Sequence, residues 1–354
     1  MTDRVRSVTA RHSRPSPTAI AGRGRRVILI LGVLIVFLLG AAGIAAYQLS
    51  NALGDQVPRV PDVFAPLPAN DRPAQQTSTT FLIVGTDSRS PEPTTGTDAA
   101  AGVDAGSQRG DVIMLASLAP DKSSASVVSI PRDSWVDIPG RGKNKVNAAY
   151  AFGGASLLTA TVEQLTGVRV DHFAVIDFAG FQAMVDAVGG IDVKVAQTTS
   201  DRGVTFRQGP NHLDGADALV YVRQRHGLPN GDLDRAHREQ NALKALLSKA
   251  SSSGALSNPL ALNSLLDATV RAVSVDDSLT NSGLRGLALT VAALRHSGVI
   301  FLNAPISGFG REGAQAVDYL DTVRSGTLWT AFRNGTASEY AAIYPSDKLS
   351  DTPA

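Results

Sequence analysis

The sequence predicts a layered α/β domain, a sheet with helices on both faces, preceded by one transmembrane helix. From residue 79 onward, short apolar segments alternate with segments whose apolar residues recur at helical spacing, the pattern of strands packed between helices. Upstream, Val27–Tyr47 contains no charged residue and is long enough to cross a hydrocarbon core. A composition of 43% hydrophobic and 18% charged residues is typical of a globular chain and excludes a disordered one.

The residues before the apolar run indicate its topology. Residues 1–26 carry seven Arg against the single acid Asp3, and a basic flank of this kind stays inside the cell. We therefore expect residues 1–26 to be a cytoplasmic tail, residues 27–47 to anchor a single-pass cell-membrane protein, and the remainder to be extracytoplasmic. A cleaved signal peptide is the alternative, although secretory apolar regions usually span only about 7–15 residues. Because the expected membrane orientation accounts for the basic residues of the tail, no nucleic-acid partner is expected.

The segments after the membrane helix are assigned in chain order. Residues 48–78 are rich in Pro, Ala and Asp without an apolar period, which predicts an extracytoplasmic linker. One folded domain is predicted over residues 79–335, and a loose C-terminal tail over residues 336–354. Strands are expected at 79–85, 112–118, 125–130, 168–177 and 299–302, and helices at 178–188, 232–250, 284–294 and in the segment that ends at Gly167.

Charged clusters border the first three predicted strands. They are Asp87 with Arg89, Arg109 with Asp111, and Arg132 with Asp133. Because ligands gather in the crevice at strand ends of α/β sheets, we expect these clusters to form one site. Two more clusters lie downstream, Arg223 with Arg225 and Asp234 with Arg235 and Arg238. Arg235 and Arg238 are three residues apart on a predicted helix and share a face, so both are predicted to bind pyrophosphate.

The residue types in these clusters indicate phosphoryl chemistry. Asp87 and Asp111 offer hard carboxylate oxygens that suit Mg²⁺, with Mn²⁺ as a substitute. Each Arg guanidinium is a planar fork that binds phosphate oxygens two at a time. The chain has no cysteine, which excludes disulfides and thiolate chemistry, and no His/Cys cluster is present for zinc.

Six ordered motifs in this sequence resemble those of the LytR-CpsA-Psr family. They are Gly85-Thr86-Asp87-Ser88-Arg89, Arg109-Gly110-Asp111, Pro131-Arg132-Asp133, Lys145-Val146-Asn147-Ala148-Ala149-Tyr150, Tyr221-Val222-Arg223-Gln224-Arg225, and Asp234-Arg235 with Arg238. The likeness extends from residue 79 to about residue 250, and the N-terminal anchor fits it as well.

The resemblance implies an extracytoplasmic phosphotransferase with the catalytic domain of that family. Such enzymes move a glycopolymer from an undecaprenyl-pyrophosphate carrier onto a peptidoglycan acceptor, with Mg²⁺ bound. By motif, Asp87 and Asp111 correspond to the metal ligands, and Arg132 lies nearest the reacting bond. The residues that correspond to pyrophosphate ligands are Arg89, Arg109, Arg132, Arg223, Arg225 and Arg235.

Several assignments stay open from the sequence. Gly110 and Glu239 stand where the family often has Ser and Gln, and Glu239 either places an acid beside the phosphates or pairs with Arg235. Asp234 and Asp133 are the candidate general bases, and metal activation of the acceptor is the third option.

Two other functions are compatible with these residues. Water in place of the acceptor would make the protein a lipid pyrophosphate hydrolase. The other hypothesis is a noncatalytic wall-binding or regulatory membrane protein. A regulatory role through DNA is disfavoured, because a cytoplasmic tail of residues 1–26 is too short for a DNA-binding domain.

Overall fold

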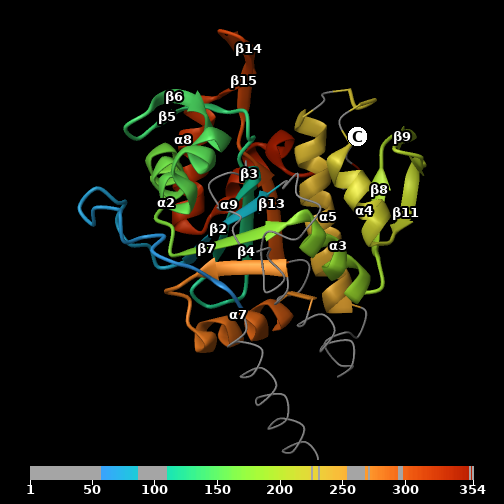
Figure 1. Cartoon of the computed structure of the whole chain (residues 1–354), viewed down its shortest axis with the longest axis horizontal. Coiled ribbons are helices and arrows are strands. Elements are labelled where there is room, and N and C mark those ends of the chain that lie inside the picture. Colours follow the sequence, from blue (N-terminus) through green and yellow to red (C-terminus); the bar gives the residue numbers. More distant parts are fainter. Residues whose placement is uncertain are drawn as a thin grey trace, which may run out of the picture. The chain divides into compact units, whose positions relative to one another are not determined.

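A seven-stranded mixed sheet lies at the centre of the fold (Figure 1). In spatial order its strands are β1 (Arg59–Val60), β12 (Val273–Asp276), β7 (His172–Asp177), β2 (Thr79–Thr86), β3 (Gly110–Leu118), β4 (Ala125–Ser129) and β13 (Val299–Asn303). The computed structural model describes residues 57–86, 110–224, 226–229, 232–252, 268–269, 272–293, 298–350 and 352. All of them belong to one of the two units of the chain, Leu53–Ala354.

Helices cover both faces of this sheet. They are α2 (Val146–Thr166), α8 (Thr322–Asn334) and α9 (Ala337–Ile343) on one face and α5 (Asp232–Ser252) on the other. Strand β3 shows the two faces, because successive side chains of a strand point to opposite sides. Ile113 and Leu115 are buried with residues of α2, α8 and α9, whereas Met114 belongs to a smaller cluster against which Leu243 of α5 packs. The predicted α/β fold is therefore confirmed.

A second core lies on the far side of α5. Its elements are α3 (Phe178–Ala187), β8 (Ile191–Val195), β9 (Thr199–Asp201), β10 (Val204–Phe206), β11 (Gly209–Leu213) and α4 (Gly215–Arg223). Ala242, Ala245 and Leu246 of α5 are buried in this core, and Leu243 packs toward the sheet. Helix α5 is thus held between the sheet and the second core, which fixes the position of its N-terminal turns.

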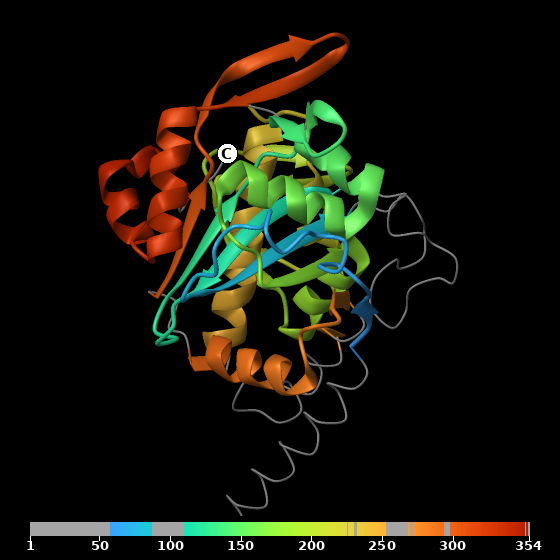
Figure 2. The ribbon, with the colours of Figure 1, turned by 90° about the vertical axis from the view of Figure 1, so that its left-hand side faces the viewer.

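Two hairpins lie at one end of the sheet. One consists of β5 (Trp135–Ile138) and β6 (Gly142–Lys145), and the other of β14 (Ile306–Glu312) and β15 (Gln315–Leu320). Strand β15 contacts β5, and the β14–β15 hairpin projects beyond the neighbouring elements in both ribbon views (Figures 1 and 2). The remaining elements are α7 (Asn281–Ala293) and the short helix η3 (Pro345–Asp347).

Helix α2 contains a kink and a glycine cap. Gly153 and Gly154 have non-helical backbone angles, and the latter has φ +62°, which a side chain would disfavour. The helix ends at Gly167 in the left-handed conformation, and its amide donates to the carbonyl of Glu163 at 2.8 Å. The predicted helix end at Gly167 is confirmed.

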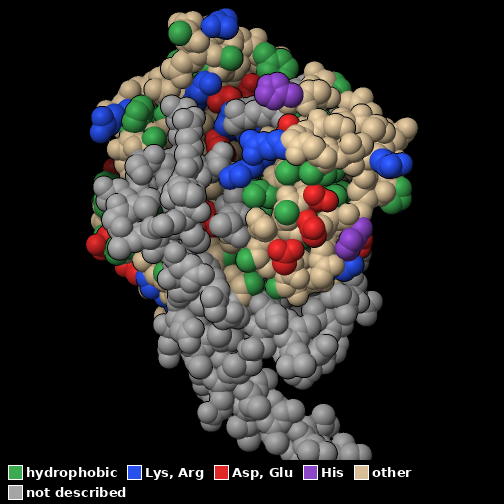
Figure 3. All heavy atoms as spheres, turned by 45° about the vertical axis from the view of Figure 1, so that its right-hand side comes forward, with side chains coloured by type: hydrophobic (Ala, Val, Ile, Leu, Met, Phe, Trp, Pro, Cys, Tyr) green, Lys and Arg blue, Asp and Glu red, His purple; other side chains and the backbone are tan. Residues whose placement is uncertain are grey.

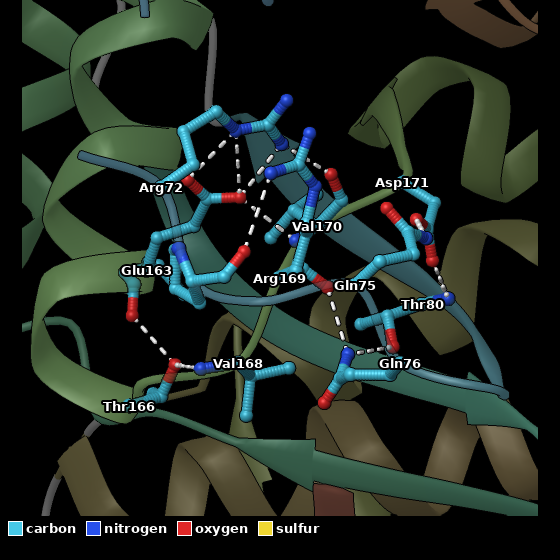
Figure 4. Close-up of polar contacts among 12 residues, drawn as sticks. Arg72, Gln75, Gln76, Thr80, Glu163, Thr166, Val168, Arg169, Val170 and Asp171 are labelled. Atoms are coloured by element: carbon cyan, nitrogen blue, oxygen red, sulfur yellow. Dashed lines mark hydrogen bonds and ion pairs between the residues drawn. The ribbon is translucent and has the colours of Figure 1, made fainter. Parts of the chain in front are cut away.

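The prediction of a linker over residues 48–78 is wrong for residues 57–78. Strand β1 pairs with β12, and Val63 is only 1% exposed within the main core. Arg72 closes this segment onto α2, because its guanidinium donates to both carboxylate oxygens of Glu163 and to the carbonyl of Val170 (Figure 4). The Pro-rich composition suggested a stalk, but a few buried anchors are enough to attach it to the domain.

The prediction of a loose tail over residues 336–354 is also wrong for most of that range. Tyr340 of α9 is 2% exposed, and its hydroxyl donates to Asp347 Oδ2 at 2.5 Å. Leu349 is 3% exposed in the cluster that contains Met114, and Arg324 of α8 pairs with Asp347. Burial of these side chains fixes the segment, although its sequence carries no long apolar run.

The predicted membrane helix, residues 27–47, lies outside the described residues. Within the part of the chain that the structure describes, none of the helices has the length and apolar character needed to cross a membrane.

Candidate functional site

Charged side chains from distant parts of the chain line one cavity at an end of the sheet. The charged residues are Asp111, Arg132, Arg235, Glu239 and Asp318, and Val112, Ile113, Ile130 and Ala236 are among the apolar ones. Figure 3 shows Lys and Arg side chains gathered on one face of the molecule with Asp and Glu side chains beside them.

The antiparallel pairing of β3 and β4 explains why Asp111 and Arg132 meet. Met114 is paired with Ser129, so the start of β3 and the end of β4 lie at the same edge of the sheet. Asp111 is the second residue of β3, and Arg132 follows β4 after the tight Ile130-Pro131 connection. Arg132 Nη1 donates to Asp111 Oδ1 at 2.5 Å, and the two side chains are 15% and 9% exposed. A charge-assisted pair this buried holds both groups in fixed positions.

Asp133 is held by neighbouring cations. Lys145 Nζ lies 3.0 Å from Asp133 Oδ1, and Arg132 Nε lies 3.8 Å from Oδ2. The Asp133 carbonyl also accepts the backbone amide of Asp318 at 2.9 Å. Asp133 therefore connects the cavity wall to the β5–β6 and β14–β15 hairpins, and these contacts favour a positioning role for it over that of a base.

Helix α5 contributes the opposite wall of the cavity. Arg235 and Glu239 are one helical turn apart, and Arg235 Nε lies 3.4 Å from Glu239 Oε1. Both side chains are only 6% exposed. The sequence left two options for Glu239, and the structure shows the pairing with Arg235. That pairing keeps the acid at the cavity while it orients the guanidinium.

Arg238 does not face this cavity. Its guanidinium is fully buried in the second core, where it donates to Gln224 Oε1 at 2.5 Å and to Thr199 Oγ1 at 2.9 Å. It also lies over the rings of Phe206 and Tyr221. The prediction that Arg238 shares the phosphate-binding face with Arg235 is thus not supported. Its physical role here is to fill and hydrogen-bond the second core.

Asp234 and Arg223 occupy positions near the ends of helices. Asp234 is 2% exposed, and its Oδ1 lies 4.0 Å from His237 Nδ1. Burial lowers the pKa of His237 below its usual value, and the nearby Asp234 carboxylate opposes that shift. Arg223 is the last residue of α4 and is half-buried. Neither Asp234 nor Arg223 is among the described residues that line the cavity.

The other predicted site residues lie outside the described part of the chain. They are Asp87, Arg89, Arg109 and Arg225. Within the described ranges, no group of three or more His, Cys, Asp or Glu side chains forms that could hold a metal ion. Asp111 supplies one carboxylate at the cavity, which fits Mg²⁺, because this ion typically takes one or two protein carboxylates together with phosphate oxygens and waters.

Asp318 is the site residue that the sequence did not reveal. It lies in β15 and forms an isolated β-bridge with Ser134 through the backbone. It also lines the cavity with Asp111 and Arg132. Gly313 has φ +60° and separates two short runs that contain Phe309, Val317 and Tyr319, a sequence pattern that could have indicated a hairpin. No sequence signal indicates that this hairpin lies beside Asp133, because that contact joins segments far apart in the chain.

Comparisons with known proteins agree with this architecture. Residues 48–327 match the model of the LytR_cpsA_psr family. The probable cell wall biosynthesis protein LcpB of Corynebacterium glutamicum is 34% identical over 335 residues, which cover 90% of this chain and 77% of that protein.

Two further relatives are named for what they act on or bind. The polyisoprenyl-teichoic acid–peptidoglycan teichoic acid transferase TagU of Enterococcus faecalis is 42% identical over 151 residues, 42% of this chain and 50% of its own. The Bacillus subtilis protein YwtF (TagT), solved with bound octaprenyl pyrophosphate lipid, aligns with a TM-score of 0.53 and 23% identity over 73% of this chain and 89% of its own. The latter likeness establishes the shared fold.

Proposed function

The chain belongs to the LytR-CpsA-Psr family and is an enzyme of the phosphotransferase type, and on that premise we propose its substrates. The donor is a glycopolymer linked to a polyprenyl-pyrophosphate carrier, and the acceptor is peptidoglycan. The observation that carries this proposal is the cavity in which Arg132, Arg235 and Asp111 converge. The name of the TagU relative and the lipid bound to YwtF (TagT) support the same two substrate classes.

The reaction joins the acceptor to the polymer through one phosphorus atom. The acceptor hydroxyl attacks the phosphorus on the polymer side, a phosphodiester forms, the bond to the bridging oxygen breaks, and polyprenyl phosphate leaves. Arg132 and Arg235 stabilise the negative charge that spreads over the phosphate oxygens. Because Arg132 is held by Asp111 and Arg235 by Glu239, both guanidiniums are oriented before the substrate arrives.

Mg²⁺ would be held by Asp87 and Asp111 and would supply further neutralisation of the diphosphate. The acceptor proton needs a base, and the described carboxylates at the cavity are Asp111, Glu239 and Asp318. Asp111 pairs with Arg132 and Glu239 with Arg235. Because the guanidiniums of Arg132 and Arg235 suit the diphosphate of the donor, we place the acceptor on the Asp318 side of the cavity.

We also propose that residues 27–47 anchor the enzyme in the cell membrane, with residues 1–26 in the cytoplasm. The charge asymmetry around the apolar run supports this topology. It would place the domain beside a lipid-linked donor and a wall acceptor.

Transfer of a labelled glycan from a polyprenyl pyrophosphate to peptidoglycan tests the proposed function. We expect Arg132→Ala and Asp111→Asn to lower kcat/KM by roughly 100- to 1,000-fold, the scale of one lost transition-state contact. Arg207→Ala is the matched control, because Arg207 is exposed and lies in the β10–β11 connection away from the cavity. Full transfer by Asp111→Asn would refute the assignment of the cavity, and release of free polymer phosphate without any adduct would identify a hydrolase instead.

A further inference from the structure

The β14–β15 hairpin connects the cavity to an exposed aromatic side chain. Asp318 of β15 lines the cavity, and its backbone amide donates to the carbonyl of Asp133 at 2.9 Å. Phe309 of β14 is the residue paired with Asp318 across the hairpin. Directly opposed residues of an antiparallel pair project from the same face, with Cβ atoms about 4.5–5.5 Å apart. The Phe309 ring therefore stands next to the residue that lines the cavity.

Phe309 is 65% exposed, although it is a large apolar side chain. Single exposed apolar residues are common on proteins, so exposure alone would mean little. The position of this one is specific, because the hairpin register sets it opposite a cavity residue. Val323 and Ile343 are similarly exposed, at 78% and 67%, but they lie on the helices α8 and α9.

Contacts between the two strands stabilise the opposite face of the β14–β15 hairpin. The Tyr319 hydroxyl donates to Glu312 Oε1 at 2.9 Å, which ties the two strands together. A Cβ atom at Gly310 would clash with the Tyr319 ring, so the absence of a side chain there lets that ring cover the backbone. Val317, opposite Gly310, is 2% exposed. One face of the hairpin is thus covered, and the face with Phe309 and Arg311 is open to solvent.

The charges around the cavity decide which substrate this open face suits. Arg132 and Arg235 are the described cations at the cavity, and they favour the diphosphate of the donor. Asp318 is an acid, which would repel that diphosphate but can accept a hydrogen bond from a neutral hydroxyl. An aromatic ring beside it offers an apolar surface to the C–H face of a sugar ring. The hairpin side of the cavity therefore has the chemistry of a glycan acceptor site.

We propose that the Phe309 face of the β14–β15 hairpin is the docking surface for the acceptor glycan strand of peptidoglycan, with a sugar ring stacked on Phe309 and its neighbour delivered to the Asp318 side of the cavity. This inference rests on the function proposed above and adds the place where the acceptor binds. The hairpin would act as a platform and would leave donor binding to the opposite wall.

The test separates acceptor binding from donor binding in the full-length protein. Transfer kinetics are measured at varied concentrations of a peptidoglycan tetrasaccharide and, separately, of the lipid-linked donor. We expect Phe309→Ala to raise the acceptor KM roughly tenfold, the scale of one lost aromatic contact, and to leave the donor KM within about twofold. Phe309→Trp, which keeps an aromatic ring, should have an acceptor KM close to that of the wild type. Ile343→Ala is the control at a similarly exposed apolar residue, and it should change neither the acceptor KM nor the donor KM.

Direct binding of the same tetrasaccharide, measured by calorimetry, distinguishes failure of this inference from failure of the proposed function. If the wild type binds the tetrasaccharide and Phe309→Ala weakens that binding roughly tenfold, the docking surface is supported even where transfer is absent. If transfer proceeds but Phe309→Ala leaves the binding and the acceptor KM unchanged, the docking surface is wrong and the function stands. A rise in the donor KM with an unchanged acceptor KM would assign the hairpin to the donor and overturn the inference.

Discussion

Arg72→Ala should strongly destabilise the domain, because this residue closes the N-terminal segment onto α2. Its guanidinium makes a two-pronged contact with Glu163, with Nη2–Oε1 at 2.7 Å and Nε–Oε2 at 3.0 Å. Nη2 also donates to the carbonyl of Val170 at 2.6 Å, and the group lies 4.8 Å from the centre of the Phe64 ring. The variant loses all of these contacts at once.

The size of the effect follows from the burial of the partner. Glu163 is 3% exposed and Arg72 is 11% exposed, so the ion pair has little access to water. Removal of Arg72 leaves a buried carboxylate whose remaining described donor is the amide of Val170, at 2.9 Å. Removal of one partner of a buried ion pair lowers the free energy of unfolding by about 3–5 kcal/mol. For a domain of this size that corresponds to a fall in melting temperature of roughly 5–8 °C.

Thermal unfolding of the full-length protein in detergent, followed by tryptophan fluorescence, measures this shift, since Trp329 is buried in the main core. Arg169→Ala is the control, because Arg169 lies in the same region and, among the described residues, its guanidinium donates one hydrogen bond, to the Pro73 carbonyl at 3.2 Å; its removal should cost about 0.5–1.5 kcal/mol. The double variant Arg72→Met/Glu163→Met should regain part of the loss, because no charge is then left unpaired. A melting temperature for Arg72→Ala equal to that of Arg169→Ala would refute the reasoning.

Three further outcomes are expected. Arg238→Ala should lower stability by about 2–4 kcal/mol and change the donor KM less than Arg235→Ala does, as calorimetry and transfer kinetics can show, because Arg238 is buried in the second core. The lowered pKa of His237 means that the folded state resists its protonation, so stability should be complete above the usual value near 6.5 and decline as the pH falls below it; His237→Gln should flatten the melting temperature between pH 7 and pH 5. A protease added to intact spheroplasts should digest the domain and spare a tag fused ahead of residue 1, and digestion of that tag would contradict the proposed topology.

The pairing of Asp111 with Arg132 illustrates what the sequence could predict. Buried strands are visible as short apolar runs, and charged residues at their borders must lie at the edges of the sheet. The antiparallel register of β3 and β4 then brings two such borders together, 2.5 Å apart between Arg132 Nη1 and Asp111 Oδ1. Local pattern and sheet geometry were sufficient here, because each cluster adjoins the strand that positions it.

Arg238 and Arg72 illustrate what the sequence could not predict. Helical spacing places Arg235 and Arg238 about 60° apart around the helix axis, close enough to share a face yet far enough apart for one to enter the second core. Which of the two does so depends on Gln224 and Thr199, which contact Arg238 from other elements. Arg72 likewise looks like a linker residue until Glu163, 91 positions later, is seen to be buried against it. In each case a long-range partner overrides the local pattern.

The charge balance of the cavity shows what the proposed reaction requires of the rest of the chain. Its described charged residues are three acids, Asp111, Glu239 and Asp318, and two guanidiniums, Arg132 and Arg235. A diphosphate brought to this wall alone would meet more formal negative than positive charge, and repulsion between partly buried charges is only weakly screened. Binding the donor therefore requires cations beyond these two. Arg89, Arg109 and Arg225, together with a metal ion on Asp87 and Asp111, would reverse the balance, so in this proposal they are a condition for donor binding and not an accessory to it.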